Sequence, residues 1–83
     1  MKHNQLGRFR IDSLMMATRL DDVAEMMKGL VIKRISLAIE YDAVEYMAIG
    51  ESFDEVEQGG FIPLYFYEIT TENGKIVSGK WVR

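Results

Sequence analysis

Acidic side chains are the most concentrated reactive groups in this 83-residue sequence. Between Glu40 and Gln58 there are seven carboxylates and no basic residue, whereas the rest of the chain has ten basic residues against six acidic ones. The seven are Glu40, Asp42, Glu45, Glu51, Asp54, Glu55 and Glu57. A surface of one charge steers association with a surface of the opposite charge. We therefore expect this acidic segment to bind a protein partner with a basic surface, the alternative being a solubilising loop.

Carboxylates can also bind divalent cations or act as acid–base pairs. Those between Glu51 and Glu57 lack the alternating ligands and central glycine of an EF-hand loop, and a glycosidase-type pair needs a cleft that 83 residues can hardly build. His3 is the single histidine and lies where we expect the terminus to fray. Cysteine is absent, and no serine has a histidine or lysine at a spacing typical of nucleophile activation. A small enzyme or metal-binding protein is therefore the least favoured hypothesis, and we predict no catalytic residue, metal or cofactor.

A second candidate site combines aromatic and basic residues near the C-terminus. Tyr65, Tyr67, Lys80 and Arg83 are predicted to share one face of the last hairpin. Rings that stack on bases and cations that neutralise phosphates are typical of single-stranded nucleic-acid binding. The alternative is packing of strand aromatics, with Tyr67 over Lys80 as a cation–π pair. The net charge of −3 favours packing, because a negative protein repels phosphates.

Apolar periodicity predicts one amphipathic helix over residues 13–28. The residues that fall on one side at 100° per residue are Met16, Ala17, Leu20, Val23, Ala24 and Met27. Asp12 or Ser13 can cap the start, and Gly29 can end the helix. Met15 and Met26 fall outside the apolar stripe. We therefore expect both methionines to be exposed and available for a homodimer contact.

The pattern then changes to the period of two that is typical of strands. The first strand runs from about Val31 to Glu40, and residues 44–50 are predicted to form its hairpin partner. Its apolar face carries Val31, Ile35, Leu37 and Ile39. The segment 52–55 fits a capping box, which predicts a short helical turn between this hairpin and the next.

The second hairpin is the clearest local signal in the chain. Residues 61–70 and 75–82 are both rich in strand-forming residues, and the Asn73-Gly74 pair between them is typical of a type I′ turn. Counting outward from a two-residue turn pairs Glu68 with Gly79 and Tyr67 with Lys80.

These elements predict a single α+β domain over residues 1–83, in the order α-β-β-β-β, with the helix packed on an antiparallel sheet of about four strands. No apolar run is long enough for a signal peptide or a membrane span, so we expect a cytoplasmic protein without a membrane partner. We expect it to be a non-catalytic protein-binding domain. A small phage or mobile-element inhibitor or adaptor, whose acidic face engages a nucleic-acid-handling protein, is the hypothesis that size and acidity favour; a nucleic-acid-binding module is the alternative.

Overall fold

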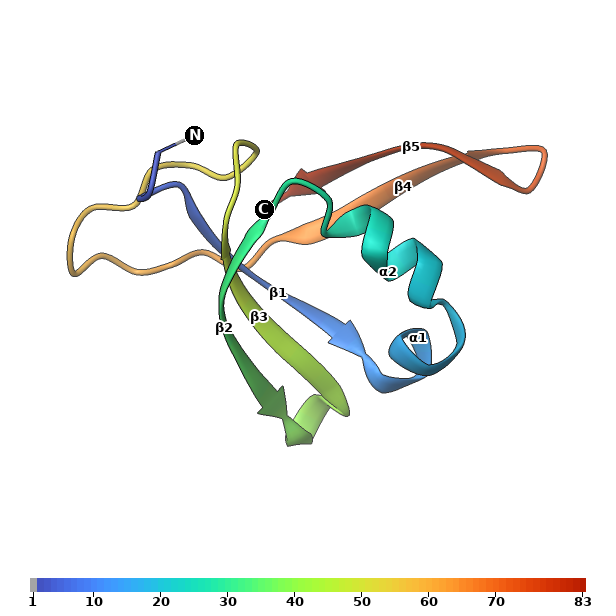
Figure 1. The fold of residues 1–83 in the computed structure, drawn as a ribbon, viewed down its shortest axis with the longest axis horizontal. Helices are drawn as coiled ribbons and strands as arrows, with labels where there is room; N and C mark the ends of the chain where they lie inside the picture. Colours follow the sequence, from blue (N-terminus) through green and yellow to red (C-terminus); the bar gives the residue numbers. More distant parts are fainter. Residues whose placement is uncertain (1) are drawn as a thin grey trace.

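The computed structural model describes residues 2–83, apart from the side chain of Ile76. The elements in chain order are β1 (Leu6–Asp12), α1 (Ser13–Thr18), α2 (Leu20–Met26), β2 (Val31–Ala38), the 3-10 helix η1 (Ile39–Tyr41), β3 (Ala43–Ile49), β4 (Phe66–Glu72) and β5 (Lys75–Val82). The first three strands form an antiparallel sheet in the order β1-β3-β2, and β4 and β5 form a separate antiparallel pair. The predicted α+β class with antiparallel sheet is confirmed. The single four-stranded sheet is wrong, because the strands divide between two sheets (Figure 1).

Strand β1 was not predicted, because the predicted element order begins with the helix at residue 13. Phe9 and Ile11 are almost completely buried, and Arg8 and Arg10 alternate with them on the other face. The whole strand pairs with β3, from Leu6 opposite Ile49 to Asp12 opposite Ala43. Alternation of apolar and basic residues over this segment is the strand signal that was missed.

The predicted long helix is instead two short ones. Arg19 has φ −131° and ψ 45°, which is outside the helical region and separates α1 from α2. The break changes the direction of the chain, so the apolar stripe does not continue from one helix to the next (Figure 1). Asp12 caps α1 as predicted, because its side chain accepts a hydrogen bond of 2.7 Å from the Met15 amide.

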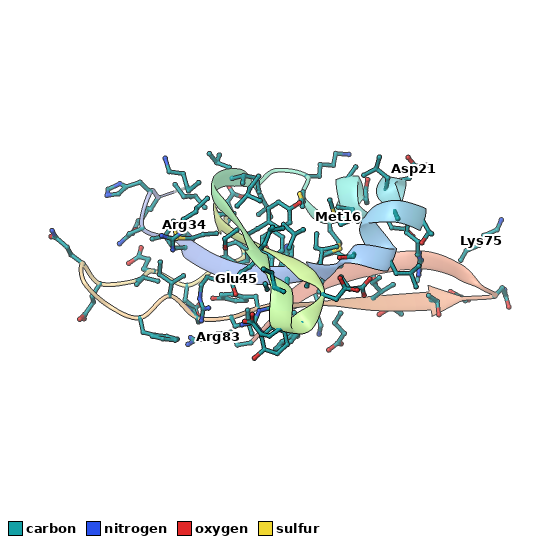
Figure 2. The ribbon with its side chains drawn as sticks, turned by 90° about the horizontal axis from the view of Figure 1, so that it is seen from below. Met16, Asp21, Arg34, Glu45, Lys75 and Arg83 are labelled. Atoms are coloured by element: carbon teal, nitrogen blue, oxygen red, sulfur yellow. The ribbon has the colours of Figure 1, made fainter. Side chains whose placement is uncertain are left out.

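Burial on the helices corrects the prediction of which residues face the core. Leu20 was placed on the apolar stripe but is 61% exposed. Met26 was placed outside the stripe but is buried in the core, and Met15 is half-buried against it. Met26 is therefore not an exposed contact for a homodimer, and Met15 is exposed only in part. Val23 is buried as predicted, and Met16 lies between the helices and the sheet, with its Sδ 3.8 Å from the Tyr46 hydroxyl (Figure 2).

Residues 50–65 connect the two sheets without the predicted helical turn. Phe53, assigned to that turn, is a core residue at the end of a tight turn in which its amide donates to the Gly50 carbonyl at 3.1 Å. The next amide, of Asp54, donates to the Tyr65 hydroxyl at 2.8 Å. Burial of one aromatic side chain thus outweighs the local capping pattern.

The β4–β5 hairpin turns at Asn73-Gly74 as predicted, since both residues have positive φ, 54° and 78°. An irregularity between Thr70 and Thr71 then shifts the pairing by one residue. As a result Glu68 lies opposite Lys80, and Tyr67 lies opposite Trp81. The predicted pairs of Glu68 with Gly79 and Tyr67 with Lys80 are therefore wrong. The tip of the hairpin, marked by Lys75, projects well beyond the rest of the molecule (Figure 2).

Trp81 joins the hairpin to the sheet. Its ring centroid lies 4.6 Å from that of Phe9 on β1, 5.5 Å from that of Phe53, and 4.9 Å from that of Tyr67 on β4. These tilted and edge-to-face contacts are the favourable arrangements for aromatic rings. The core therefore lies between one face of the three-stranded sheet and the layer formed by the helices and the hairpin. We call this sheet face, which carries Phe9 and Tyr46, the inner face.

Candidate protein-binding edge

The seven acidic residues do not form one surface. Glu40 and Asp42 lie at the turn between β2 and β3, whereas Glu51, Asp54, Glu55 and Glu57 lie in the loop after the other end of β3. The intervening strand has seven residues, and at about 3.3 Å per residue it separates the two groups by about 20 Å. The predicted continuous acidic face is therefore absent from the described chain.

Basic residues from other segments also neutralise several of the seven. Glu55 forms an ion pair with Lys2, and this hydrogen bond raises the pKa of the lysine ammonium above its ordinary value. Asp54 accepts a hydrogen bond of 2.9 Å from Arg83. The uneven charge of the sequence is therefore partly cancelled when the chain folds, because both termini return to the acidic loop.

Glu45 lies at the centre of a small charged cluster on the face of the sheet opposite the core, which we call the outer face. Its carboxylate lies 3.0 Å from Arg10 Nε and 3.6 Å from an Arg8 guanidinium nitrogen. The two guanidinium groups stack in turn on exposed rings, Arg10 on Tyr41 at 4.3 Å and Arg8 on Phe61 at 5.2 Å. This carboxylate therefore has an intramolecular role in holding two arginines.

The predicted aromatic and basic face on the last hairpin is formed only in part, since the Arg83 guanidinium lies over the Tyr65 ring, 6.0 Å from its centroid. Tyr65 is buried, and Tyr67 is half-buried against Trp81. Lys80 lies opposite Glu68, a position displaced by one residue from Tyr67 and so on the other face of the hairpin. The two tyrosines are therefore part of the core side of the hairpin and do not offer a stacking surface beside the lysine.

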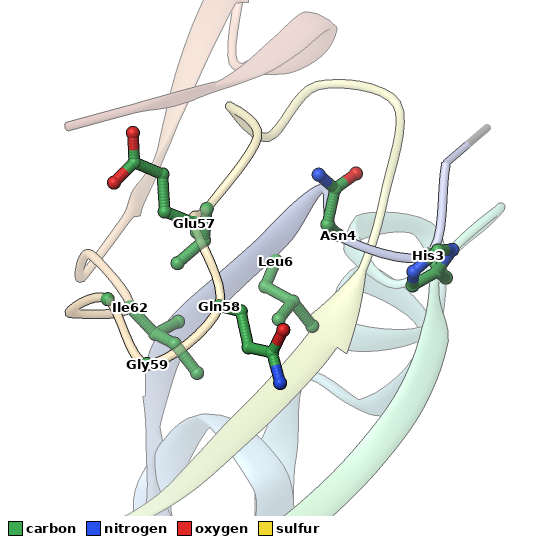
Figure 3. Close-up of a pocket in the computed structure, with 9 residues that line it drawn as sticks. His3, Asn4, Leu6, Glu57, Gln58, Gly59 and Ile62 are labelled. Carbon is green, nitrogen blue, oxygen red and sulfur yellow. The ribbon is translucent and has the colours of Figure 1, made fainter.

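A pocket of about 400 Å³ lies between the N-terminal segment and the loop that carries the acidic residues (Figure 3). Leu6, Val56 and Ile62 line it together with polar side chains that include His3 and Glu57. His3 and Glu57 are both exposed, and no hydrogen bond joins them. The residues that the structure describes contain no cluster of metal-ligand type. General acid–base catalysis requires two groups within hydrogen-bond reach of the reacting atoms. His3 and Glu57, as placed here, do not form such a pair.

The edge strand β2 combines unpaired backbone groups with exposed apolar side chains. Among the described residues only β3 pairs with β2, so every second residue of β2 directs its backbone groups outward without a strand partner. Ile35 is 61% exposed and Leu37 is 75% exposed. We call this strand edge, with the exposed side chains of Ile35 and Leu37, the β2 edge.

The position of β2 explains why these apolar side chains are exposed. Ile35 lies opposite Tyr46 and Leu37 lies opposite Val44, and directly opposite residues share a face, so both belong to the inner face. The helices and the hairpin lie toward β1, so they leave Ile35 and Leu37 of β2 uncovered, whereas Ile32 packs against the core (Figure 1). An irregularity after Ile32 turns Val31 to the outer face, so the predicted single face of Val31, Ile35, Leu37 and Ile39 is wrong at Val31. It is also wrong at Ile39, which lies in η1 and not in the strand.

The opposite edge of the same sheet is not free in this way. The Arg8 amide donates to the Pro63 carbonyl at 2.9 Å, and the Tyr65 amide donates to the Arg8 carbonyl at 2.7 Å. The segment 63–65 therefore covers part of the edge of β1 with a short parallel pairing. The β2 edge lacks such a cover among residues 2–83, and it combines free backbone groups with apolar side chains.

The sequence pattern contained the residues of this edge but did not identify their role. Period-two alternation predicted a strand from Val31 to Glu40, of which Val31–Ala38 is observed, yet it does not tell whether an apolar face is covered. Identifying β2 as an edge strand would have required the strand order, because β1 pairs with the other side of β3 and leaves β2 at the edge. In the described chain no helix is long and apolar enough to cross a lipid bilayer. No protein-family model, curated protein or solved structure matches the chain.

Proposed function

We propose that this chain is a non-catalytic protein-binding domain, and that the β2 edge accepts an extended strand of a protein partner. The observation that carries the proposal is the combination of unpaired backbone groups with the exposed Ile35 and Leu37. An added strand gains main-chain hydrogen bonds from such an edge, and neighbouring apolar side chains supply the hydrophobic contribution.

The composition of the edge supports this reading. Sheet proteins usually protect a free edge with several charges, a proline, an irregularity or a covering segment. Residues 34–38 are Arg, Ile, Ser, Leu and Ala, with one charge and no proline. The irregularity of β2 lies before this stretch, between Ile32 and Arg34. The stretch therefore remains suited to regular pairing.

The non-catalytic part of the proposal rests on the solvation of the polar groups. Across the described residues no polar or charged side chain is buried. Catalytic acids, bases and nucleophiles are commonly activated by burial beside a specific partner. That the partner is a basic, nucleic-acid-handling protein, and that the chain is an inhibitor or adaptor, stay predictions from the charge of the sequence.

The test compares proteins captured from cell extract by three forms of the chain. Leu37→Lys places a charge at the β2 edge, and Leu20→Lys makes the same change at an exposed leucine of α2, away from β2. We expect proteins held by the wild type to be retained by Leu20→Lys and lost by Leu37→Lys. Amide hydrogen exchange within residues 34–38 should slow when the captured protein is added back. Equal capture by both variants would reject the β2 edge as the binding site.

A further inference from the structure

We propose that the strand occupying the β2 edge is β2 of a second copy of this chain, giving a homodimer with one continuous six-stranded sheet. The inference rests on the proposed function, because it names the partner of that same edge. Two identical strands that pair antiparallel are related by a twofold axis, so each presents the same surface to the other. The β2 edge must therefore be self-complementary in shape, in apolar contacts and in charge.

The limits of the regular edge determine the register. The pairing of β2 with β3 is irregular between Ile32 and Arg34, and η1 begins directly after Ala38. Residues 34–38 are therefore the stretch available for regular pairing. When two copies of this stretch pair antiparallel along their full length, Ser36 lies opposite Ser36 of the second copy. The small hydroxyl side chains at this central position leave room for close approach and can hydrogen-bond to each other.

This register brings the exposed apolar side chains together. Ile35 of each copy lies opposite Leu37 of the other, and the twofold axis keeps the inner faces of both sheets on the same side. The four side chains then form one apolar row across the junction. Each of these side chains is exposed in one copy and becomes buried against the other three in the dimer.

Charge supports an antiparallel arrangement of two copies over a parallel one. Arg34 lies opposite Ala38 of the second copy, and η1, which carries Glu40, begins directly after Ala38, so the two opposite charges lie near each other. Arg34 contacts Met47 Sδ at 3.8 Å, and neither Arg34 nor Glu40 forms an ion pair within the described chain. A parallel pair would instead bring the two Arg34 side chains together. The antiparallel dimer therefore brings opposite charges close to each other at both ends of the junction.

The first experiment measures mass by sedimentation equilibrium from low to high micromolar concentration. The wild type and Leu20→Lys should approach twice the chain mass of 9.6 kDa, whereas Leu37→Lys should remain at 9.6 kDa. Circular dichroism melts show whether Leu37→Lys is folded. If that variant is unfolded, Ser36→Arg provides the second test, because it places two like charges on the twofold axis without changing an apolar residue.

The second experiment tests the register by exchanging charges. Arg34→Glu and Glu40→Arg should each weaken dimerisation by about tenfold, since each replaces two attractive contacts with two repulsive ones. The double variant should recover wild-type affinity, and so should an equimolar mixture of the two single variants. Single variants that dimerise like the wild type, or a double variant that does not recover, would overturn the proposed register.

The outcomes separate this inference from the proposed function. A wild type that remains monomeric, while Leu37→Lys loses another captured protein, overturns the homodimer and keeps the β2 edge as a binding site. A dimer whose amides in residues 34–38 exchange as fast as in a monomeric variant also overturns the inference, because the contact then lies elsewhere. If the wild type is monomeric and Leu37→Lys captures the same proteins as the wild type, both the homodimer and the β2 edge as a binding site are overturned.

Discussion

Ile35 and Tyr46 lie directly opposite each other on neighbouring strands, yet Tyr46 is 7% exposed and Ile35 is 61% exposed. Both side chains belong to the inner face of the sheet, so the layer that buries this face ends between β3 and β2. The Phe9 ring, 5.2 Å from that of Tyr46 on the other side, is almost fully buried. Burial therefore decreases across one row of the sheet from β1 to β2.

This gradient predicts very different effects of truncation within the same row. Tyr46→Ala should lower the free energy of unfolding by about 3–5 kcal/mol, because it leaves a cavity beside Phe9. Ile35→Ala should lower it by less than about 1 kcal/mol, because most of that side chain is already in water. Urea unfolding at low micromolar protein concentration, chosen to disfavour the proposed dimer, measures both. Equal losses would show that the core extends over β2.

Charges on the helices distinguish the observed fold from the single helix predicted from periodicity. Leu20→Asp should leave the domain folded, since Leu20 is exposed and an acidic residue is favourable in the first turn of α2. Val23→Asp should unfold the domain, because it places an unpaired charge in the core. Far-ultraviolet circular dichroism of the two variants gives the comparison. A folded Val23→Asp would contradict the assignment of α2 to the core layer.

Gly7 tests the packing of the aromatic core against β1. A Cβ at this position would lie 2.8–2.9 Å from three carbons of the Phe53 ring, which is closer than van der Waals contact. Gly7→Ala should therefore lower the free energy of unfolding by about 1–3 kcal/mol. In a Phe53→Leu background the same substitution should cost less, because the branched aliphatic side chain can move away. A double-mutant cycle by chemical denaturation measures this coupling, and additive effects would argue against the contact.

Local patterns predicted the elements that depend on neighbouring residues. The Asn73-Gly74 turn follows from turn chemistry, and strands β2 and β3 follow from period-two alternation. The break at Arg19 and the core position of Phe53 depend on packing between distant segments, which no local pattern records. The same limit applies to the candidate site. Ile35 and Leu37 were recognised as strand residues, but their exposure depends on where β1, the helices and the hairpin pack.

Glu45 is the acidic residue whose role the structure changes most, from a binding residue to a contact between Arg8 and Arg10. The three side chains are each about a quarter exposed, so solvent screens their attraction only in part. Glu45→Gln keeps the shape of the side chain but removes the charge that separates two guanidinium groups. We expect it to lower the free energy of unfolding by about 1 kcal/mol, with a larger loss at low salt than at high salt.

The matched control is Glu57→Gln, which removes the same charge from an exposed loop residue that forms no ion pair in the described chain. This substitution should change the free energy of unfolding by less than about 0.5 kcal/mol at either salt concentration. Denaturation of both variants at low and high salt gives the comparison. If the two substitutions had the same small effect, Glu45 would not stabilise the outer face, and its carboxylate would again be available for a basic partner. If only Glu45→Gln destabilises, the negative charge of this segment is used within the fold at that position, and a partner is left with the carboxylates at the ends of β3.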